Sequence, residues 1–176
     1  MTADQNEARV PKPVTVSHIF GEIVWLLSQS PRHADFTAVE MNWLLMPPIL
    51  RRQFHIFREG EHPIGAAIWA MLDDAGEQKV MKGLRETGAK LEDAEWTAGD
   101  RLWLIELIAP FATVENRHAE LMMADLITGP FSKRAFKMLS TNPDSGESQV
   151  VSIPSDMGER LVQNTLEKMG ASGPCQ

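Results

Sequence analysis

The chain has 176 residues, 43% of them hydrophobic and 23% charged, which is the composition of an ordinary globular domain with a substantial core. Its formal net charge of −7 leaves no basic excess to neutralise phosphates, so nucleic acid is excluded as the expected partner. The single cysteine, Cys175, cannot form an internal disulfide, and the chain has neither an apolar run long enough to span a bilayer nor a signal-peptide segment, so we expect a cytoplasmic protein.

Two helices are predicted in the N-terminal part of the domain. Apolar residues recur at helical spacing after Ser17, which we take as the N-cap. This helix should end at residues 28–30, because Pro31 disfavours helical backbone at the residue before it. A second helix is expected over residues 37–45, with its end at Pro47-Pro48.

Strands and helices alternate in the rest of the chain. A hairpin is predicted over residues 53–58 and 63–70, around a polar turn that contains one glycine. The apolar run at residues 101–108 predicts a buried strand. The remaining expected elements are helices over 73–88, 115–127 and 156–169, strands over 134–139 and 149–153, and turns over 93–100 and 142–146.

This order of elements predicts an α+β domain, a central and mostly antiparallel sheet flanked by helices. We place the domain at residues 16–169. Residues 1–15 are polar and aperiodic, so we expect them to be disordered. Residues 170–176 are expected to form a flexible tail.

One carboxylate, Glu106, interrupts the apolar strand. A charge in such a strand is costly unless it is paired or used. Because side chains alternate along a strand, we expect Glu106 to share a face with Leu102, Leu104 and Ile108. Either Glu106 lies at the rim of an edge strand, or its carboxylate orients a histidine and stabilises its charge.

His33 is the best candidate for that histidine. It follows the first predicted helix, in a loop where a side chain contributes little to packing. It is either a surface histidine or a general base, since imidazole titrates near neutrality. Ser30 lies three residues earlier and is a nucleophile, a hydrogen-bond donor or simply the residue before a proline.

Two small basic clusters occur in this acidic chain. They are Arg51-Arg52 and the group Lys133, Arg134 and Lys137. Such clusters are usually solvated surface, but they can bind an acidic partner or a phosphate, so we treat them as candidate substrate-binding residues. The histidines and the cysteine show no metal-ligand spacing and no glycine-rich phosphate loop is present, so we assign no metal and no bound cofactor.

Several stretches together resemble the toxin-activating lysine acyltransferases, the hemolysin-activating family that fatty-acylates RTX protoxins. The most specific is Trp96–Phe111, which contains Trp-Leu-Ile-Glu-Leu-Ile-Ala-Pro-Phe. The others, in chain order, are Gly21–His33, with Trp-Leu-Leu-Ser-Gln-Ser-Pro-Arg-His, then Pro48-Ile49 with Gln53, and Pro63–Ala70, with Trp-Ala at its end. The resemblance covers roughly residues 17–140.

The resemblance implies a fold related to the Gcn5-type N-acetyltransferases. It also implies an acyl-acyl-carrier-protein donor and an internal lysine of an RTX-type protein as acceptor. The family's catalytic histidine matches His33 and its helix-end serine matches Ser30. Its catalytic aspartate matches position 106, where this chain departs with a glutamate; a second departure is Ala112, where the family usually has glycine.

We therefore expect an acyltransferase in which neutral His33 takes a proton from the acceptor lysine, while Glu106 fixes the tautomer and stabilises the imidazolium. Its expected partners are acyl-carrier protein and an RTX-type protein, and a homodimer is left open. The alternative is a catalytically degenerate member that only binds acyl-carrier protein or the substrate protein. A third reading is an α+β scaffold in which Glu106 is structural.

Overall fold

The computed structural model describes residues 14–83, 90–141, 147–161 and 163. The expected N-terminal disorder up to residue 13, the turn over 142–146 and the C-terminal tail lie outside these residues. The end of the expected 73–88 segment and half of the expected 156–169 helix do so as well, although a helical segment does begin at Met157.

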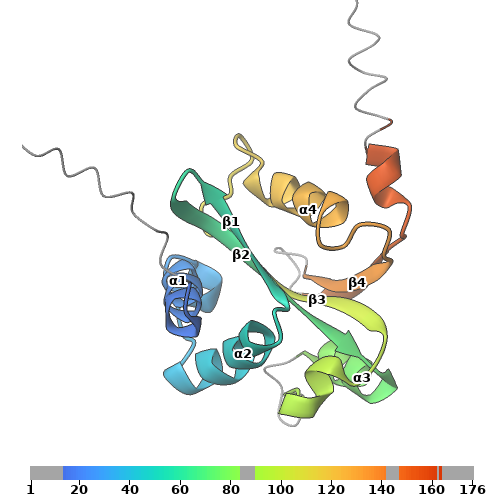
Figure 1. The fold of residues 1–176 in the computed structure, drawn as a ribbon, viewed down its shortest axis with the longest axis horizontal. Helices are drawn as coiled ribbons and strands as arrows, with labels where there is room; N and C mark the ends of the chain where they lie inside the picture. The colour runs from blue at the N-terminus through green and yellow to red at the C-terminus, as the bar shows by residue number, and fades with distance from the viewer. Residues whose placement is uncertain (1–13, 84–89, 142–146, 162, 164–176) are drawn as a thin grey trace, which may run out of the picture.

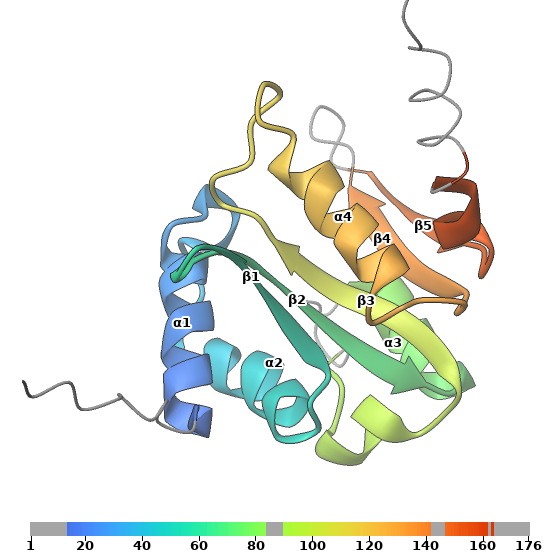
Figure 2. The same ribbon diagram turned by 45° about the horizontal axis from the view of Figure 1, so that its top comes forward.

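A sheet with helices on both faces forms the described part of the chain (Figures 1 and 2). Its strands are β1 (Phe54–Glu59), β2 (His62–Leu72), β3 (Arg101–Ile108), β4 (Phe136–Thr141) and β5 (Ser148–Ile153), in this order across the sheet. The helices are α1 (Val16–Ser28), α2 (Ala38–Leu50), α3 (Asp74–Lys82) and α4 (His118–Thr128), with short 3₁₀ helices η1 (Pro31–His33) and η2 (Asp93–Thr97). β3 and β4 run parallel and the other described pairs are antiparallel, so the predicted α+β domain with a mostly antiparallel sheet is confirmed.

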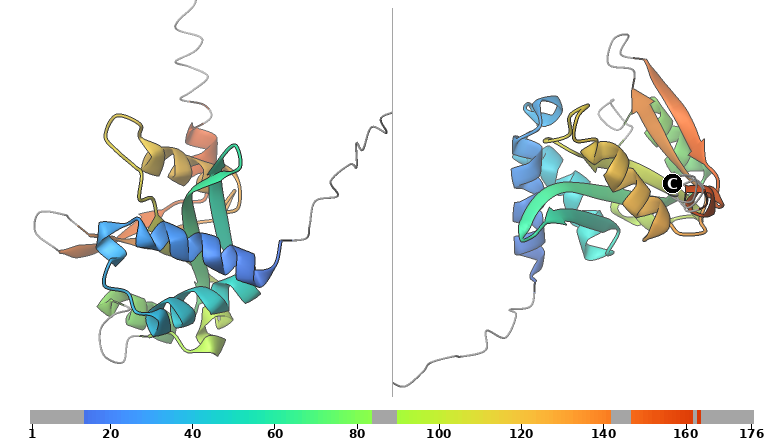
Figure 3. Two further views of the ribbon diagram at one scale, coloured as in Figure 1. Left: turned by 90° about the vertical axis from the view of Figure 1, so that its left-hand side faces the viewer. Right: turned by 90° about the horizontal axis from the view of Figure 1, so that it is seen from above.

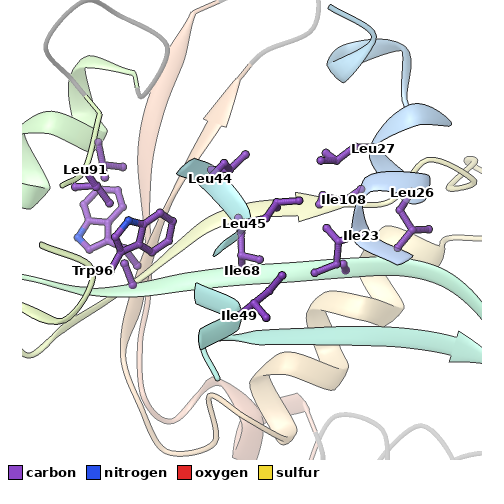
Figure 4. Close-up of a cluster of buried hydrophobic side chains, with 14 of the residues drawn as sticks. Ile23, Leu26, Leu27, Leu44, Leu45, Ile49, Ile68, Leu91, Trp96 and Ile108 are labelled. Atoms are coloured by element: carbon purple, nitrogen blue, oxygen red, sulfur yellow. The ribbon is translucent and has the colours of Figure 1, made fainter. Parts of the chain in front are cut away.

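Two apolar cores pack against opposite faces of this sheet. α1 and α2 cover one face and α4 covers the other (Figure 3). In the first core, Ile23 of α1 and Leu45 of α2 meet Ile68 of β2 (Figure 4). The second core joins Leu126 of α4 to Leu104 of β3.

The inner strand β2 contributes side chains to both cores, because successive side chains point to opposite faces of the sheet. Ala66, Ile68 and Ala70 are buried in the first core, and Ala67 is buried in the second. Such a strand reads as a continuous apolar run because neither of its faces meets water.

The end of α2 differs from the prediction. The helix continues through Pro47 and Pro48 to Leu50 instead of stopping before them. Each proline lacks a backbone donor, but its own carbonyl still accepts a hydrogen bond. Arg51 N–H donates to Pro47 O, and Gln53 N–H donates to Pro48 O. Burial of this last turn against the first core therefore outweighs the local preference of the prolines.

Smaller differences concern the ends of elements. The N-cap of α1 is Thr15, whose side chain accepts a hydrogen bond from His18 N–H, and not Ser17. α4 begins three residues later than expected, after Arg117 in the left-handed region. No described helix combines the length and the apolar character that crossing a bilayer requires.

Candidate active site

His33 is held in a rigid turn at the end of α1. Ser30 N–H donates to Leu27 O, His33 N–H donates to Ser30 O, and Phe36 N–H donates to His33 O. The imidazole packs edge-on against the Phe36 ring, with 5.1 Å between centroids. His33 is only 4% exposed. The position just past the helix is confirmed, but the surface reading of this histidine is wrong.

The two nitrogens of His33 have different neighbours. Nδ1 lies 2.8 Å from Ser30 Oγ, within hydrogen-bond distance. Nε2 is buried without a hydrogen bond, 3.5 Å from Glu106 Oε1. A serine hydroxyl can donate to a ring nitrogen or accept from it; when it accepts from Nδ1–H, the lone pair lies on Nε2, which can then act as a base. Ser30 therefore contacts Nδ1, and the carboxylate of Glu106 faces Nε2.

A β-bulge aims Glu106 at His33. Leu104 of β3 pairs with Trp69 of β2 and Glu106 pairs with Ile68, so Ile105 is left without a partner on β2. The extra residue breaks the alternation of side chains. Leu104 therefore packs in the second core, whereas Glu106 shares the side of its partner Ile68, which is the side of α1, α2 and η1.

The predicted face of Glu106 is therefore only partly right. Ile108 does lie on its side of the sheet, but Leu102 and Leu104 lie on the other. The sequence carries no signal for the bulge, because the apolar residues around Glu106 suit either face of a buried strand equally well.

Arg32 is a site residue that the sequence reasoning missed. Its Nη2 forms an ion pair with Glu106 Oε1, the same oxygen that faces His33 Nε2. The Arg32 side chain is 69% exposed and that of Glu106 is 13% exposed. The available sequence signal was its place immediately before His33 in the turn.

A largely apolar cavity of about 300 Å³ opens beside these three side chains. Arg32, His33 and Glu106 all line it. Most of its other walls are apolar, supplied by Phe36, Trp43, Leu44, Val80, Ile105 and Leu139. The described pairing of β3 with β4 stops at Leu104 and Met138, and residues just beyond that point in both strands line the cavity. A polar mouth on an apolar cavity suits a ligand with a reactive end and a hydrocarbon tail.

The five basic candidate residues do not line this cavity. Arg51 forms an ion pair with Asp93, and Lys137 forms one with Glu77. Arg52, Lys133 and Arg134 lie on the exposed surface of the described residues.

Glu77 of α3 is a buried carboxylate with three donors. It accepts hydrogen bonds from Trp103 Nε1 at 2.7 Å and Lys137 Nζ at 2.8 Å, and Arg101 Nη1 lies 3.3 Å away. Burial opposes the ionised form, but the hydrogen bonds from Lys137 and Trp103 outweigh it and leave the pKa of Glu77 below its ordinary value. This group ties α3 to β3 and β4, which gives Lys137 a structural partner.

Glu77→Gln is expected to lower the free energy of unfolding by about 1–3 kcal/mol, because one charge of the cluster is lost while Lys137 and Arg101 can still reach water and Trp103 Nε1 can still donate to the glutamine oxygen. Since the pKa of Glu77 is lowered in the folded state, its contribution is complete above the ordinary value of 4.5 and is lost as the pH falls through the folded pKa. Urea unfolding at pH 7 and below pH 4 measures both effects, with the exposed Glu61→Gln as control.

A double-mutant cycle with Lys137→Met tests whether Lys137 has a structural role or is only a solvated surface residue. Coupling between Glu77→Gln and Lys137→Met is expected in the free energy of unfolding. Additive effects of the two changes would contradict the structural role.

No group of three or more histidine, cysteine, aspartate or glutamate side chains within the described residues is arranged to hold a metal ion. The chemistry that His33, Glu106 and Arg32 can perform is proton transfer next to a stabilised charge.

Comparison with known proteins gives a consistent result. The model of the RTX toxin acyltransferase family matches residues 12–155. A leukotoxin-activating lysine-acyltransferase of a Pasteurella haemolytica-like species is 28% identical over 152 residues, 86% of this chain and 84% of the relative. A protein-lysine palmitoyltransferase of Bordetella bronchiseptica is 30% identical over 60% of this chain and 55% of its own length. An uncharacterized protein of Synechocystis is 30% identical over 82% of this chain and 92% of its own length.

Proposed function

This chain belongs to the RTX toxin acyltransferase family, and from this premise we propose that it transfers a fatty acyl group from acyl-acyl-carrier protein to an internal lysine of an RTX-type protein. The observation that carries the proposal is the buried, unpartnered Nε2 of His33, 3.5 Å from Glu106 Oε1 and at the wall of an apolar cavity.

His33 acts as the general base in this proposal. A lysine amine has a pKa near ~10.4 and must lose a proton before it attacks. In this proposal Ser30 Oγ, 2.8 Å from Nδ1, accepts the hydrogen of Nδ1, so that Nε2 carries the lone pair that accepts the proton of the lysine. The lysine nitrogen then bonds to the thioester carbonyl carbon, and the carbon–sulfur bond breaks as the sulfur takes up the proton held by His33. The sulfur leaves as a thiol, and the new amide nitrogen releases its second proton to solvent.

Glu106 supplies the compensating negative charge. Once His33 holds the proton, the imidazolium is buried, and a buried cation is costly without an anion beside it. The carboxylate 3.5 Å from Nε2 meets that need without itself taking the proton. Ser30 sets the tautomer and does not have to become acylated for this sequence of steps.

The apolar cavity is the proposed site of the acyl chain. Most of its walls are hydrocarbon, and an apolar chain gains free energy roughly in proportion to the area that it buries. The thioester carbon, at the head of the chain, would then lie beside His33 and Glu106.

We extend the proposal to the fold, the donor and the cellular setting. A Gcn5-related fold is supported by the mixed sheet, in which the described parallel pairing of β3 with β4 ends where the cavity begins. Exposed Arg52, Lys133 and Arg134 stay candidates for docking the acidic donor, whose binding would then weaken with salt. A cytoplasmic location, the homodimer and the lack of a bound cofactor also stay predictions.

The alternative, a degenerate member that binds without turnover, is not favoured. It was suggested by the glutamate at position 106, but the bulge brings that longer carboxylate to His33.

One experiment separates enzyme from binding module. The purified chain is incubated with acyl-acyl-carrier protein and an RTX-type protein, and the acceptor is examined by mass spectrometry. We expect a mass increase equal to one acyl group on a lysine, stable to neutral hydroxylamine as an amide should be. Binding of acyl-carrier protein without any adduct would favour the binding module.

A further inference from the structure

Glu106 Oε1 has two neighbours that compete for it. His33 Nε2 lies 3.5 Å away on the buried side, and Arg32 Nη2 forms an ion pair with it from the exposed side. The two contacts meet on one oxygen atom, although a carboxylate has two.

An acceptor amine has to bind next to the same two atoms, Nε2 of His33 and Oε1 of Glu106. To give its proton to His33, the amine nitrogen must come within hydrogen-bond reach of Nε2, about 2.6–3.2 Å. Because Oε1 is only 3.5 Å from Nε2, a nitrogen placed there is also next to Oε1, where Arg32 Nη2 already lies. A lysine that arrives as an ammonium would meet a like charge at short range, which is unfavourable.

We propose that Oε1 of Glu106 and Nε2 of His33 form the subsite for the acceptor amine, and that Arg32 fills this subsite as a displaceable cation in the empty enzyme. This inference rests on the proposed function. The lysine ammonium replaces the guanidinium on Oε1, Arg32 turns out into solvent, and the proton then passes to Nε2.

The exposure of Arg32 distinguishes a displaceable cation from a fixed clamp. The buried carboxylate of Glu77 is an example of a fixed charge in this protein, because three donors surround it. Arg32, by contrast, is 69% exposed and touches Glu106 through one nitrogen. An ion pair held by one contact from a largely exposed arginine contributes little to stability, so a substrate cation can displace the arginine.

A binding measurement without donor tests the inference independently of acyl transfer. The probes are Nα-acetyl-lysine methylamide and its neutral analogue Nα-acetyl-norleucine methylamide, followed by the ¹⁵N resonances of the His33 ring. Arg32→Gln removes the competing charge, and we expect it to lower the Kd of the lysine probe about two- to fivefold. The norleucine probe should bind both proteins alike.

Two further variants complete the design. Glu106→Gln should abolish the preference for lysine over norleucine, because it removes the anion of the subsite. Arg117→Gln is the matched control, since Arg117 is also 69% exposed and also pairs with a glutamate, Glu120. It should bind the lysine probe as the wild type does.

The outcomes are separable. If Arg32→Gln binds the lysine probe no more tightly than the wild type, Arg32 is a fixed clamp and the inference is wrong. Absence of lysine binding in both proteins also overturns it, whereas the proposed function is decided separately by the mass adduct. In turnover assays of Arg32→Gln, a displaceable Arg32 predicts a lower KM for the acceptor, whereas a fixed clamp predicts a lower kcat.

Discussion

Replacement of His33 by glutamine is expected to lower the rate of lysine acylation by about 100- to 10,000-fold, the range that a lost general base typically costs. A glutamine amide can occupy the place of Nε2, but it has no lone pair basic enough to take a proton from an ammonium. Single-turnover transfer from acyl-acyl-carrier protein, followed by mass spectrometry of the acceptor, measures the change.

Glutamine is a better replacement than alanine because of the burial of His33. Alanine would be suitable only if His33, as a loop residue, contributed little to packing. The imidazole is 4% exposed and packs on Phe36, so alanine would also leave a cavity and an unpaired Ser30 hydroxyl. A lost activity in that variant would then be ambiguous.

The control for this prediction is His62→Gln, which makes the same change at an exposed position of the β1–β2 hairpin. It should keep the wild-type rate and melting temperature. Turnover within about tenfold of the wild type in a folded His33→Gln protein would remove His33 from the proton-transfer step, since a general base contributes more than that.

Much of the fold followed from local patterns in the sequence. The hairpin around Gly60 and the apolar run of β3 gave strands at the expected places, because burial on both faces produces continuous apolar segments. The end of α2 did not follow, because there the packing of a buried turn overrides the local preference of Pro47 and Pro48.

The site was predictable in its parts but not in its geometry. A carboxylate in an apolar strand requires a partner, and this argument led from Glu106 to His33 before their distance was known. The bulge at Ile105 and the resulting side of Glu106 depend on how β3 is registered on β2, a long-range property that alternation cannot express. The role of Arg32 could not be predicted, because nothing in the sequence distinguishes a single exposed arginine from an ordinary surface residue.

Glu106→Gln is expected to reduce turnover by about 100-fold or more, because the shape of the side chain is kept while the charge that stabilises the imidazolium is lost. The melting temperature should change little, since Glu106 pairs with a largely exposed arginine. If Glu106 is only structural, the pattern reverses: the rate stays near that of the wild type and the melting temperature falls. Glu120→Gln, an exposed change on α4, controls for loss of one negative charge.

Glu106→Asp tests whether turnover depends only on the charge of the side chain or also on its length. Aspartate keeps the charge and is the residue of the resembling family, so we expect turnover within about tenfold of the wild type, far above that of Glu106→Gln. The shorter side chain draws the carboxylate back by roughly one bond length, about 1.5 Å, from a position that is already 3.5 Å from Nε2. A rate as low as that of Glu106→Gln would mean that reach across the bulge matters as much as charge. An active Glu106→Gln protein would instead leave His33 to act without a carboxylate partner.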